Sequence, residues 1–268
     1  DQYVFFATAQ GMVKKVQLSA FKNVRSQGIK AIALKEGDYL VGAAQTSGSD
    51  DIMLFSNLGK AIRFNEYWEK SGNDEAEDAD IETEISDDLE DETADNENAL
   101  PSGKHGVRPS GRGSGGLRGM RLPADGKIVS LITFAPEAAQ SDLQVLTATA
   151  NGYGKRTPIA DYSRKNKGGQ GNIAINTGER NGDLVAATLV GETDDLMLIT
   201  SGGVLIRTKV EQIRETGRAA AGVRLINLDE GEQLVSLERV AEEPEDASVS
   251  GEENTTEANV TTEDNTLQ

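Results

Sequence analysis

The segment VLTATANGYGKRT, residues 145–157, decides the fold class of this 268-residue chain. Small and β-branched residues lead up to Asn151-Gly152, and a second short strand-like run follows. Asn-Gly between two β-prone runs is typical of a type I′ β-hairpin, because both turn residues need a positive φ angle. The segment therefore predicts two antiparallel strands joined by a tight turn.

The same pattern occurs four times along the chain. An apolar run, a small polar turn with glycine and a second short strand recur as VFFATAQGMVKKV (4–16), IMLFSNLGKAIRF (52–64), the segment 145–157, and LMLITSGGVLIRT (196–208). We call the turn glycines the anchor glycines; they are Gly11, Gly59, Gly152 and Gly203. The residue four positions after each one is basic: Lys15, Arg63, Arg156 and Arg207. Self-similarity of this kind indicates a repeat protein.

Each copy continues with two further landmarks. A second glycine follows at Gly28, Gly116, Gly171 and Gly222, and a glycine-acid pair at 37–38, 125–126, 182–183 and 231–232 precedes another apolar run. The spacing from anchor glycine to second glycine is 17, 57, 19 and 19 residues, so the second copy carries an insertion of about 38 residues.

A repeat of this length with four short strands is typical of a propeller blade. A single blade cannot bury its own faces, so blades must pack side by side. We therefore predict an all-β, propeller-like domain over residues 1–240, built from four repeats of about 48 residues. The predicted blades are about 1–48, 49–140, 141–192 and 193–240.

The net charge of −18 is distributed unevenly. Residues 71–100 carry 14 acidic and no basic side chains, and residues 241–268 carry nine acidic and no basic ones. The other 210 residues hold all 27 basic groups and 22 acidic ones, which leaves a mildly basic body. Blocks of like charge with few apolar residues are usually disordered. We expect a disordered acidic insertion at 71–100 and a disordered acidic tail at 241–268.

The composition excludes most metal and nucleophile chemistry. The chain has one histidine, His105, and no cysteine, so it cannot form a zinc site of the usual ligand clusters. The absence of cysteine also suits a reducing cytoplasm. No apolar run approaches the length of about 20 residues that a membrane helix needs. Because the chain begins at Asp1 and enters directly on a strand-like run, we expect a piece of a longer protein.

Several stretches of the sequence resemble the C-terminal domain of the DNA gyrase A protein. They are ATAQGMVKKV, LFSNLGKAIRF, TATANGYGKRTPIADY, GERNGDLVAATLV, LMLITSGGVLIRTKVEQI and GRAAAGVRLINL. The resemblance implies a β-pinwheel, a propeller-like disc whose blades exchange strands, which wraps duplex DNA around a basic rim and so directs negative supercoiling. We expect no cofactor and no metal, in line with the composition. The resemblance also implies two partners, the remainder of the gyrase A protein and, through it, the gyrase B protein.

The chain departs from the family pattern in two ways. The family usually has six blades and carries a basic glycine motif, the gyrase box, in the first; the four copies here resemble the last four blades. The nearest counterpart of the box, residues 165–171, lies in the third copy and is flanked by residues of a later blade. The second departure is the acidic insertion, which the common pattern lacks.

Basic residues recur in the loop that follows the second strand of every copy. Because the blades are related by rotation, equivalent loops lie on the same rim and form a curved basic track. Such a track is what bending duplex DNA requires. We predict phosphate contacts from Lys22, Arg25, Lys30, Arg108, Arg112, Arg118, Arg121, Arg164, Lys165, Lys167, Arg214, Arg218 and Arg224.

The basic residues of the second strands leave two interpretations open. They either contact DNA at the rim or pair with carboxylates of neighbouring blades. We include them among the candidate DNA-binding residues: Lys14, Lys15, Arg63, Lys155, Arg156 and Arg207.

Other candidate sites find little support. The run GRGSGG at 111–116 lacks the Gly-Lys-Ser/Thr of a P-loop. The acidic stretch lacks the spacing of a calcium-binding loop. Tyr153 and Tyr162 fit blade packing rather than DNA cleavage, and the resemblance puts the cleaving tyrosine outside this chain. We therefore expect no catalysis from this chain by itself.

Two functions compete with a gyrase domain. One is the related domain of topoisomerase IV. The other is a propeller that binds acidic proteins, although such platforms usually present aromatic residues, and only 4% of this chain is aromatic. The acidic segments lead to a separate hypothesis, since a tethered polyanion competes with DNA for a basic rim at high effective concentration. The alternative for these segments is a role in solubility.

Overall fold

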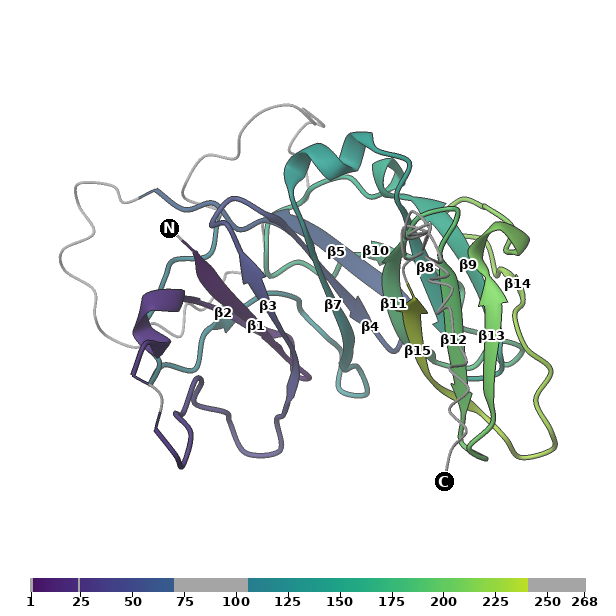
Figure 1. Ribbon diagram of the computed structural model, residues 1–268, viewed down its shortest axis with the longest axis horizontal. Coiled ribbons are helices and arrows are strands. Elements are labelled where there is room, and N and C mark those ends of the chain that lie inside the picture. Colours follow the sequence, from purple (N-terminus) through teal and green to yellow (C-terminus); the bar gives the residue numbers. More distant parts are fainter. Residues whose placement is uncertain (1, 24, 70–105, 241–268) are drawn as a thin grey trace, which may run out of the picture.

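The computed structural model describes residues 2–23, 25–69 and 106–240; the predicted acidic insertion, the acidic tail and His105 lie outside the described residues. The described residues form four antiparallel sheets that follow one another along an arc (Figure 1). The all-β prediction is confirmed.

The strands of the first two sheets are β1 (Tyr3–Thr8), β2 (Met12–Gln17), β3 (Leu40–Thr46) and β6 (Leu117–Arg118), then β4 (Asp51–Ser56), β5 (Lys60–Asn65), β7 (Ile128–Phe134) and β10 (Asn172–Ile173). The strands of the other two are β8 (Gln144–Thr149), β9 (Tyr153–Pro158), β11 (Leu184–Val190) and β14 (Val223–Arg224), then β12 (Asp195–Thr200), β13 (Leu205–Lys209) and β15 (Leu234–Val240). Short 3-10 helices are η1 (Leu18–Phe21), η4 (Pro136–Gln140), η5 (Ile159–Asp161) and η6 (Val210–Gln212).

Each sheet is built on one of the four predicted hairpins, but the turn differs from the prediction. In all four, the N–H of the anchor glycine donates to the carbonyl three residues earlier, at 2.9–3.0 Å, and the glycine has φ between 73° and 83°. The turn before Gly152 is thus centred on Ala150 and Asn151, and the type I′ turn expected at Asn151-Gly152 was wrong. β8 ends at Thr149 and β9 begins at Tyr153, so a three-residue loop joins them, in which the glycine takes the left-handed last position.

The sheets are linked by exchanged strands. β6, β10 and β14 come from the second, third and fourth copies, and each pairs with the second hairpin strand of the preceding copy, β2, β5 and β9. The second glycines allow this close approach: a Cβ at Gly116, Gly171 or Gly222 would lie 2.4–2.5 Å from a carbonyl oxygen of the paired strand. Exchange between blades, which the resemblance implied, is therefore present. The second, third and fourth predicted blade intervals each supply strands to two sheets, and the first supplies strands to one sheet only.

The two ends of the arc lack this closure. The fourth sheet has only three described strands, β13-β12-β15, and its edge strand β13 is exposed, with Leu205 at 55%. At the other end, a Cβ on Gly28 would meet nothing within 4 Å, although this glycine occupies the same repeat position as Gly116.

The hydrophobic cores lie between successive sheets. Phe5 and Val13 of the first copy pack with Ile52 and Leu54 of the second, and equivalent clusters join the second to the third and the third to the fourth. β4 in the second sheet is therefore buried along its whole length. β12 in the last sheet alternates between buried and half-buried residues, because among the described residues only one face of this sheet has a neighbouring sheet.

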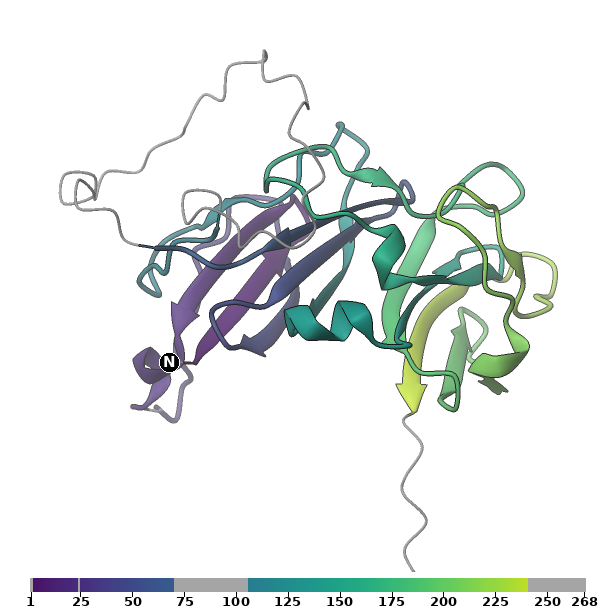
Figure 2. The same ribbon diagram turned by 90° about the horizontal axis from the view of Figure 1, so that it is seen from above.

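The same packing distinguishes the inner and outer sides of the arc. β3, β7, β11 and β15 contact one another in turn and form the inner wall. By the strand order of the sheets, the exchanged strands β6, β10 and β14 lie at the opposite, outer edge (Figure 2).

Candidate nucleic-acid interface

The outer edge is formed by the exchanged strands and the segments that lead to them. We call this edge the rim, and the segments 107–116, 162–171 and 213–222 the rim loops. Each rim loop runs along a second hairpin strand, because the N–H groups of Ser110, Lys165 and Thr216 donate to the carbonyls of Lys15, Arg63 and Arg156 at 2.7–2.9 Å. The repeat thus places three equivalent loops along one edge.

Most of the basic residues predicted in loops are accessible. Lys22, Arg25, Lys30, Arg108, Arg118, Arg214 and Arg224 are exposed, while Arg112, Arg121, Arg164, Lys165, Lys167 and Arg218 are half-buried. The positions repeat: four residues before the second glycine stand Arg112, Lys167 and Arg218, and two residues after it stand Lys30, Arg118 and Arg224, with Ile173 as the exception. The first position precedes the exchanged strand and the second is the last residue of β6 and β14, so cations recur along the rim.

The basic residues of the second strands are not part of this surface, with one exception. Lys14, Lys15, Arg63, Lys155 and Arg156 are 0–9% exposed, so they are not accessible to a duplex on the rim. Their burial favours the second interpretation, pairing within the protein, because the face of the strand that sequence alone leaves undetermined is covered here by the rim loop of the next copy. Arg207 in the last sheet is the exception, since no rim loop covers β13 in the described chain.

Two of the buried lysines hold the backbone of rim loops. The Lys14 ammonium donates to the carbonyls of Arg112 at 2.7 Å, Ser114 at 2.8 Å and Ala31 at 3.0 Å. The Lys155 ammonium donates to the carbonyls of Gly217, at 2.5 Å, and Arg218. Burial lowers the pKa of Lys14 to about 8. Burial, with Arg218 adding to it and Asp161 opposing it, lowers the pKa of Lys155 to about 8.

Among the other buried cations, Lys15 pairs with a carboxylate of the next copy, as the second interpretation of the sequence allowed, whereas Arg63 and Arg156 pair with Asp51 and Glu192 of their own copies. Lys15 contacts Glu66 of the next copy, with Nζ and Oε2 3.7 Å apart. Burial raises the pKa of Glu66, although Lys15 and hydrogen bonds from the N–H groups of Asp50 and Gly48 oppose the shift. Arg156 donates from Nε to the carbonyl of Ile213 at 2.5 Å.

Asp51 is the centre of a buried charge network. Its carboxylate accepts from Arg63 Nε and Nη2 at 2.8 and 2.6 Å, and from Asn65 Nδ2 at 2.9 Å. Arg164, predicted to contact DNA, donates to the same carboxylate from Nε at 3.0 Å. Arg164 therefore joins a rim loop to the second sheet. The equivalent pair in the last sheet, Arg207 with Asp195, is open to solvent, with Arg207 63% exposed.

Sequence reasoning missed two basic residues near the rim. Arg180 lies over the Tyr153 ring, with Cζ 4.3 Å from the centroid, and Arg224 donates from Nη2 to the Tyr153 hydroxyl at 2.6 Å. Lys60 directly follows the anchor glycine Gly59 and lines a groove at the rim with Arg218. Neither residue belongs to a loop that the repeat pattern marks as basic, so no sequence signal singles them out.

The described ranges meet neither the requirements of a metal-binding cluster nor those of a membrane-spanning helix. No group of three or more His, Asp or Glu side chains is gathered there in a way that suits a metal ion. No helix among the described residues has the length and apolar character to cross a membrane.

Comparison with known proteins gives the same assignment over most of the chain. The family model "DNA gyrase C-terminal domain, beta-propeller" matches residues 2–47, 50–67, 105–135, 144–190 and 194–241. The chain is 93% identical to the DNA gyrase A protein of Neisseria gonorrhoeae over 248 residues, and 45% identical to that of Aeromonas salmonicida over 256 residues. These matches cover 92% of this chain and 27% of each relative, so the chain spans about a quarter of the length of these relatives.

Two solved structures share the fold. A DNA gyrase A C-terminal domain matches with a TM-score of 0.66 at 23% identity, covering 90% of this chain and 66% of that one. The C-terminal domain of a DNA topoisomerase IV matches with a TM-score of 0.69 at 22% identity, covering 89% of this chain and 62% of that one. The likeness to these two structures shows the architecture, and the family model supplies the assignment. The chain belongs to the family of DNA gyrase C-terminal domains with a β-propeller fold.

Proposed function

We propose that this chain binds and bends duplex DNA as the accessory, non-catalytic C-terminal part of a bacterial DNA gyrase A protein. The observation that carries the proposal is the recurrence of cations at two fixed positions of the rim, which include Arg112 and Arg118 at one exchanged strand and Arg218 and Arg224 at another. A stiff duplex bends only if contacts along a curved surface offset the deformation energy. Equivalent cations along an arc provide such contacts.

The binding is directed to phosphates rather than to bases. The rim consists of two-residue strands and glycine-rich loops, and the described residues contain no helix of a size that reads a DNA groove. Lys and Arg side chains that neutralise phosphates release counterions, so the affinity should fall steeply with salt and depend little on sequence. The chain's own part in supercoiling is therefore to hold DNA in a curve, while strand cleavage belongs to another part of the proposed enzyme.

Two observations favour a gyrase over a topoisomerase IV and over a protein-binding propeller. The relatives with 93% and 45% identity are both DNA gyrase A proteins. Tyr153, the aromatic residue that Arg224 contacts at the rim, is 9% exposed and lies beneath Arg180 and Arg224, so its ring is not open to a protein partner. A platform for acidic proteins would use the same cations but would lack a dependence on DNA length.

A titration across a salt series tests the proposal. The unaltered chain should bind a duplex of about 150 base pairs more tightly than one of about 20, because only the longer one reaches several rim loops. The logarithm of the affinity should fall linearly with the logarithm of salt concentration, with a slope that reports several phosphate contacts. Equal affinity per site for both lengths would contradict bending. Absence of binding at low salt, also after removal of residues 241–268 and 71–100, would favour the protein-binding alternative.

A further inference from the structure

The junctions between blades are not equivalent at the rim. Between the first two exchanged strands the rim is closed by backbone hydrogen bonds: Gly168 N donates to Gly119 O at 2.8 Å, and Arg121 N donates to Gly169 O at 2.9 Å. At the next junction the positions of Gly168 and Gly169 are occupied by Ala219 and Ala220. The two backbone bonds that close the first junction have no counterpart here among the described residues. The Asn181 side-chain amide instead donates to the carbonyls of Asn176 and Ala221, at 2.6 and 2.7 Å, and a groove of about 920 Å³ lies beside residues 217–220.

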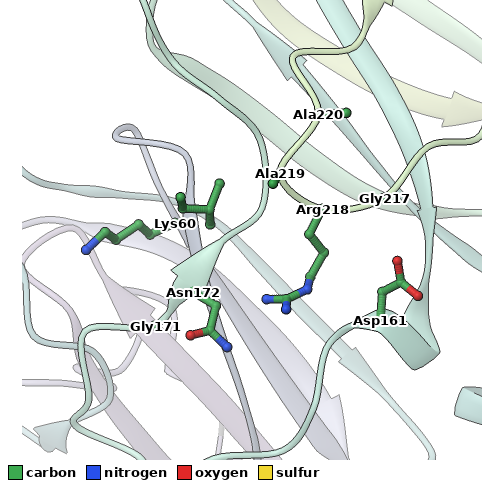
Figure 3. A pocket seen from close by; sticks show the side chains of 9 residues that line it. Lys60, Asp161, Gly171, Asn172, Gly217, Arg218, Ala219 and Ala220 are labelled. Carbon is green, nitrogen blue, oxygen red and sulfur yellow. The ribbon is translucent and has the colours of Figure 1, made fainter.

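The groove is formed by backbone and by three charged side chains. Its walls are β10 with the preceding Gly171 on one side and residues 217–220 on the other, and Lys60, Arg218 and Asp161 line it. Figure 3 shows the Arg218 guanidinium directed across the groove toward Asn172, while Lys60 lies on the far side with its ammonium pointing away. Arg218 takes part in no ion pair within the described part of the chain. Its guanidinium is therefore available to an external anion.

The segment that carries Arg218 is held by a residue that DNA cannot reach. Lys155 is 0% exposed, and its ammonium donates to the carbonyl of Gly217 and to the carbonyl of Arg218 itself. A lysine is not needed here for the fold, because the equivalent positions in the second and fourth copies are Ile62 and Ile206. The rim loop 162–171, which covers the strand of Ile62, is held instead by the backbone bonds that it makes with Gly119 and Arg121. Lys155, which holds Gly217 and Arg218, and Asn181, which holds Ala221, thus fix the segment at the junction where the two backbone bonds are missing.

We infer that the groove between β10 and residues 217–220 seats one stretch of the DNA sugar-phosphate backbone, with Arg218 as the phosphate contact and Lys155 as the positioning residue that fixes the Arg218 loop. The inference rests on the proposed function and deepens it, because it assigns one contact to a particular junction and one role to a buried side chain. Gly171, Asn172 and the small side chains of Ala219 and Ala220 leave the backbone open to close approach. The Asp161 carboxylate repels an anion, so the phosphate occupies the side of the groove toward which Arg218 points.

A double-mutant cycle on the full chain tests the inference. Arg218→Ala should lower the affinity for a duplex of about 150 base pairs by about three- to tenfold at low salt and reduce the salt slope by about one phosphate contact. Lys155→Met, which keeps the length and the apolar stem, should give a loss of similar size, although Lys155 cannot touch DNA. The two losses should not add, because both remove the same contact.

The chain contains its own control for this cycle. Lys14→Met removes a buried ammonium of the same kind, which holds the Arg112 loop instead. The loss of DNA affinity caused by Lys14→Met should add to the loss caused by Arg218→Ala. It should not add to the loss caused by Arg112→Ala. Amide hydrogen exchange at Ala220, whose N–H donates to Gly217 O at 3.2 Å, should speed up in Lys155→Met and stay unchanged in Arg218→Ala. Should Lys155→Met not fold, Lys155→Ile, which copies the residue of the second and fourth copies, replaces it.

The absence of cysteine allows the groove to be probed directly. Ala220→Cys places a single thiol in the groove, and bound duplex should slow its alkylation by iodoacetamide severalfold. Val235→Cys, on the inner strand β15 and 51% exposed in the unaltered chain, should be alkylated equally with and without DNA. Inorganic phosphate at the same ionic strength should protect neither thiol, which separates a DNA backbone from a free anion.

The outcomes separate this inference from the proposed function. If the unaltered chain binds long DNA with a steep salt slope while Arg218→Ala and Lys155→Met bind equally well and Ala220→Cys is not protected, the groove assignment is wrong and the proposed function stands. Additive losses from Arg218→Ala and Lys155→Met would overturn the positioning role alone. If the unaltered chain does not bind DNA, both fail.

Discussion

The buried network around Asp51 gives the sharpest test of how this repeat stabilises its blades. Asp51→Ala removes the partner of a buried guanidinium: Asp51 is 0% exposed and Arg63 is 8% exposed. The substitution also removes the acceptor for Asn65 and for Arg164. Breaking a buried pair by removing one partner typically costs about 3–5 kcal/mol, because an uncompensated charge stays inside.

The surroundings of Arg63 place the expected loss near the lower end of that range. Its Nη1 still donates to the Tyr162 carbonyl at 2.9 Å, and its guanidinium still lies 5.3 Å from the centroid of the Phe134 ring. We expect a loss of about 3 kcal/mol, which for a domain of this size lowers the Tm by about 6–12 °C. Thermal unfolding followed by circular dichroism and by the fluorescence of the only tryptophan, Trp68, measures the effect.

The repeat supplies a matched control in its last sheet. Asp195→Ala removes the same partner eight residues before the anchor glycine, but Arg207 is 63% exposed and stays solvated. An exposed pair contributes about 1 kcal/mol or less, so the Tm should fall by less than about 4 °C. Equal losses in the two variants would refute the reasoning, because they would show that burial does not decide the strength of this pair.

Three further predictions concern other features. Burial lowers the pKa of Lys14 and Lys155 to about 8, below the ordinary value of 10.5, so the folded chain releases these protons at lower pH than the unfolded chain. The free energy of unfolding should therefore rise between about pH 8 and 10.5, by at most about 3 kcal/mol for each lysine. Urea unfolding at several pH values should show this rise in the unaltered chain and a smaller rise in Lys14→Met/Lys155→Met, because burial also lowers the pKa of Lys15 and Lys167; a rise of unchanged size would contradict the assignment. Gly222→Ala should lower the Tm more than Gly28→Ala. Both glycines have a positive φ, but only a Cβ at Gly222 would lie 2.4 Å from a carbonyl oxygen. Equal Tm values for the two variants would argue against the exchange geometry. Deleting residues 241–268, with their nine acidic groups, should raise DNA affinity at low salt if the tail competes for the rim; unchanged affinity and salt slope would leave only a role in solubility.

The sequence by itself determined the repeat. The spacing of the anchor glycines fixes where each hairpin turns, because the last residue of the loop must adopt a left-handed conformation that glycine tolerates best. The apolar runs that follow predicted β3, β7, β11 and β15, because short β-prone runs bounded by turn residues seldom form anything else. The family resemblance rests on the same local features, which explains why it could be identified without coordinates.

Only the tertiary structure decided which cations face solvent. Lys155 and Arg156 are adjacent and equally basic in the sequence, and Arg63 and Arg207 occupy the same repeat position, yet Arg207 alone of these four is exposed. The reason is that a rim loop from the next copy covers the second strand wherever a next copy exists in the described chain, and neither hydrophobic periodicity nor charge encodes that long-range cover. The groove beside Arg218 follows from the same cause, since it depends on whether two loops from different copies meet or stay apart.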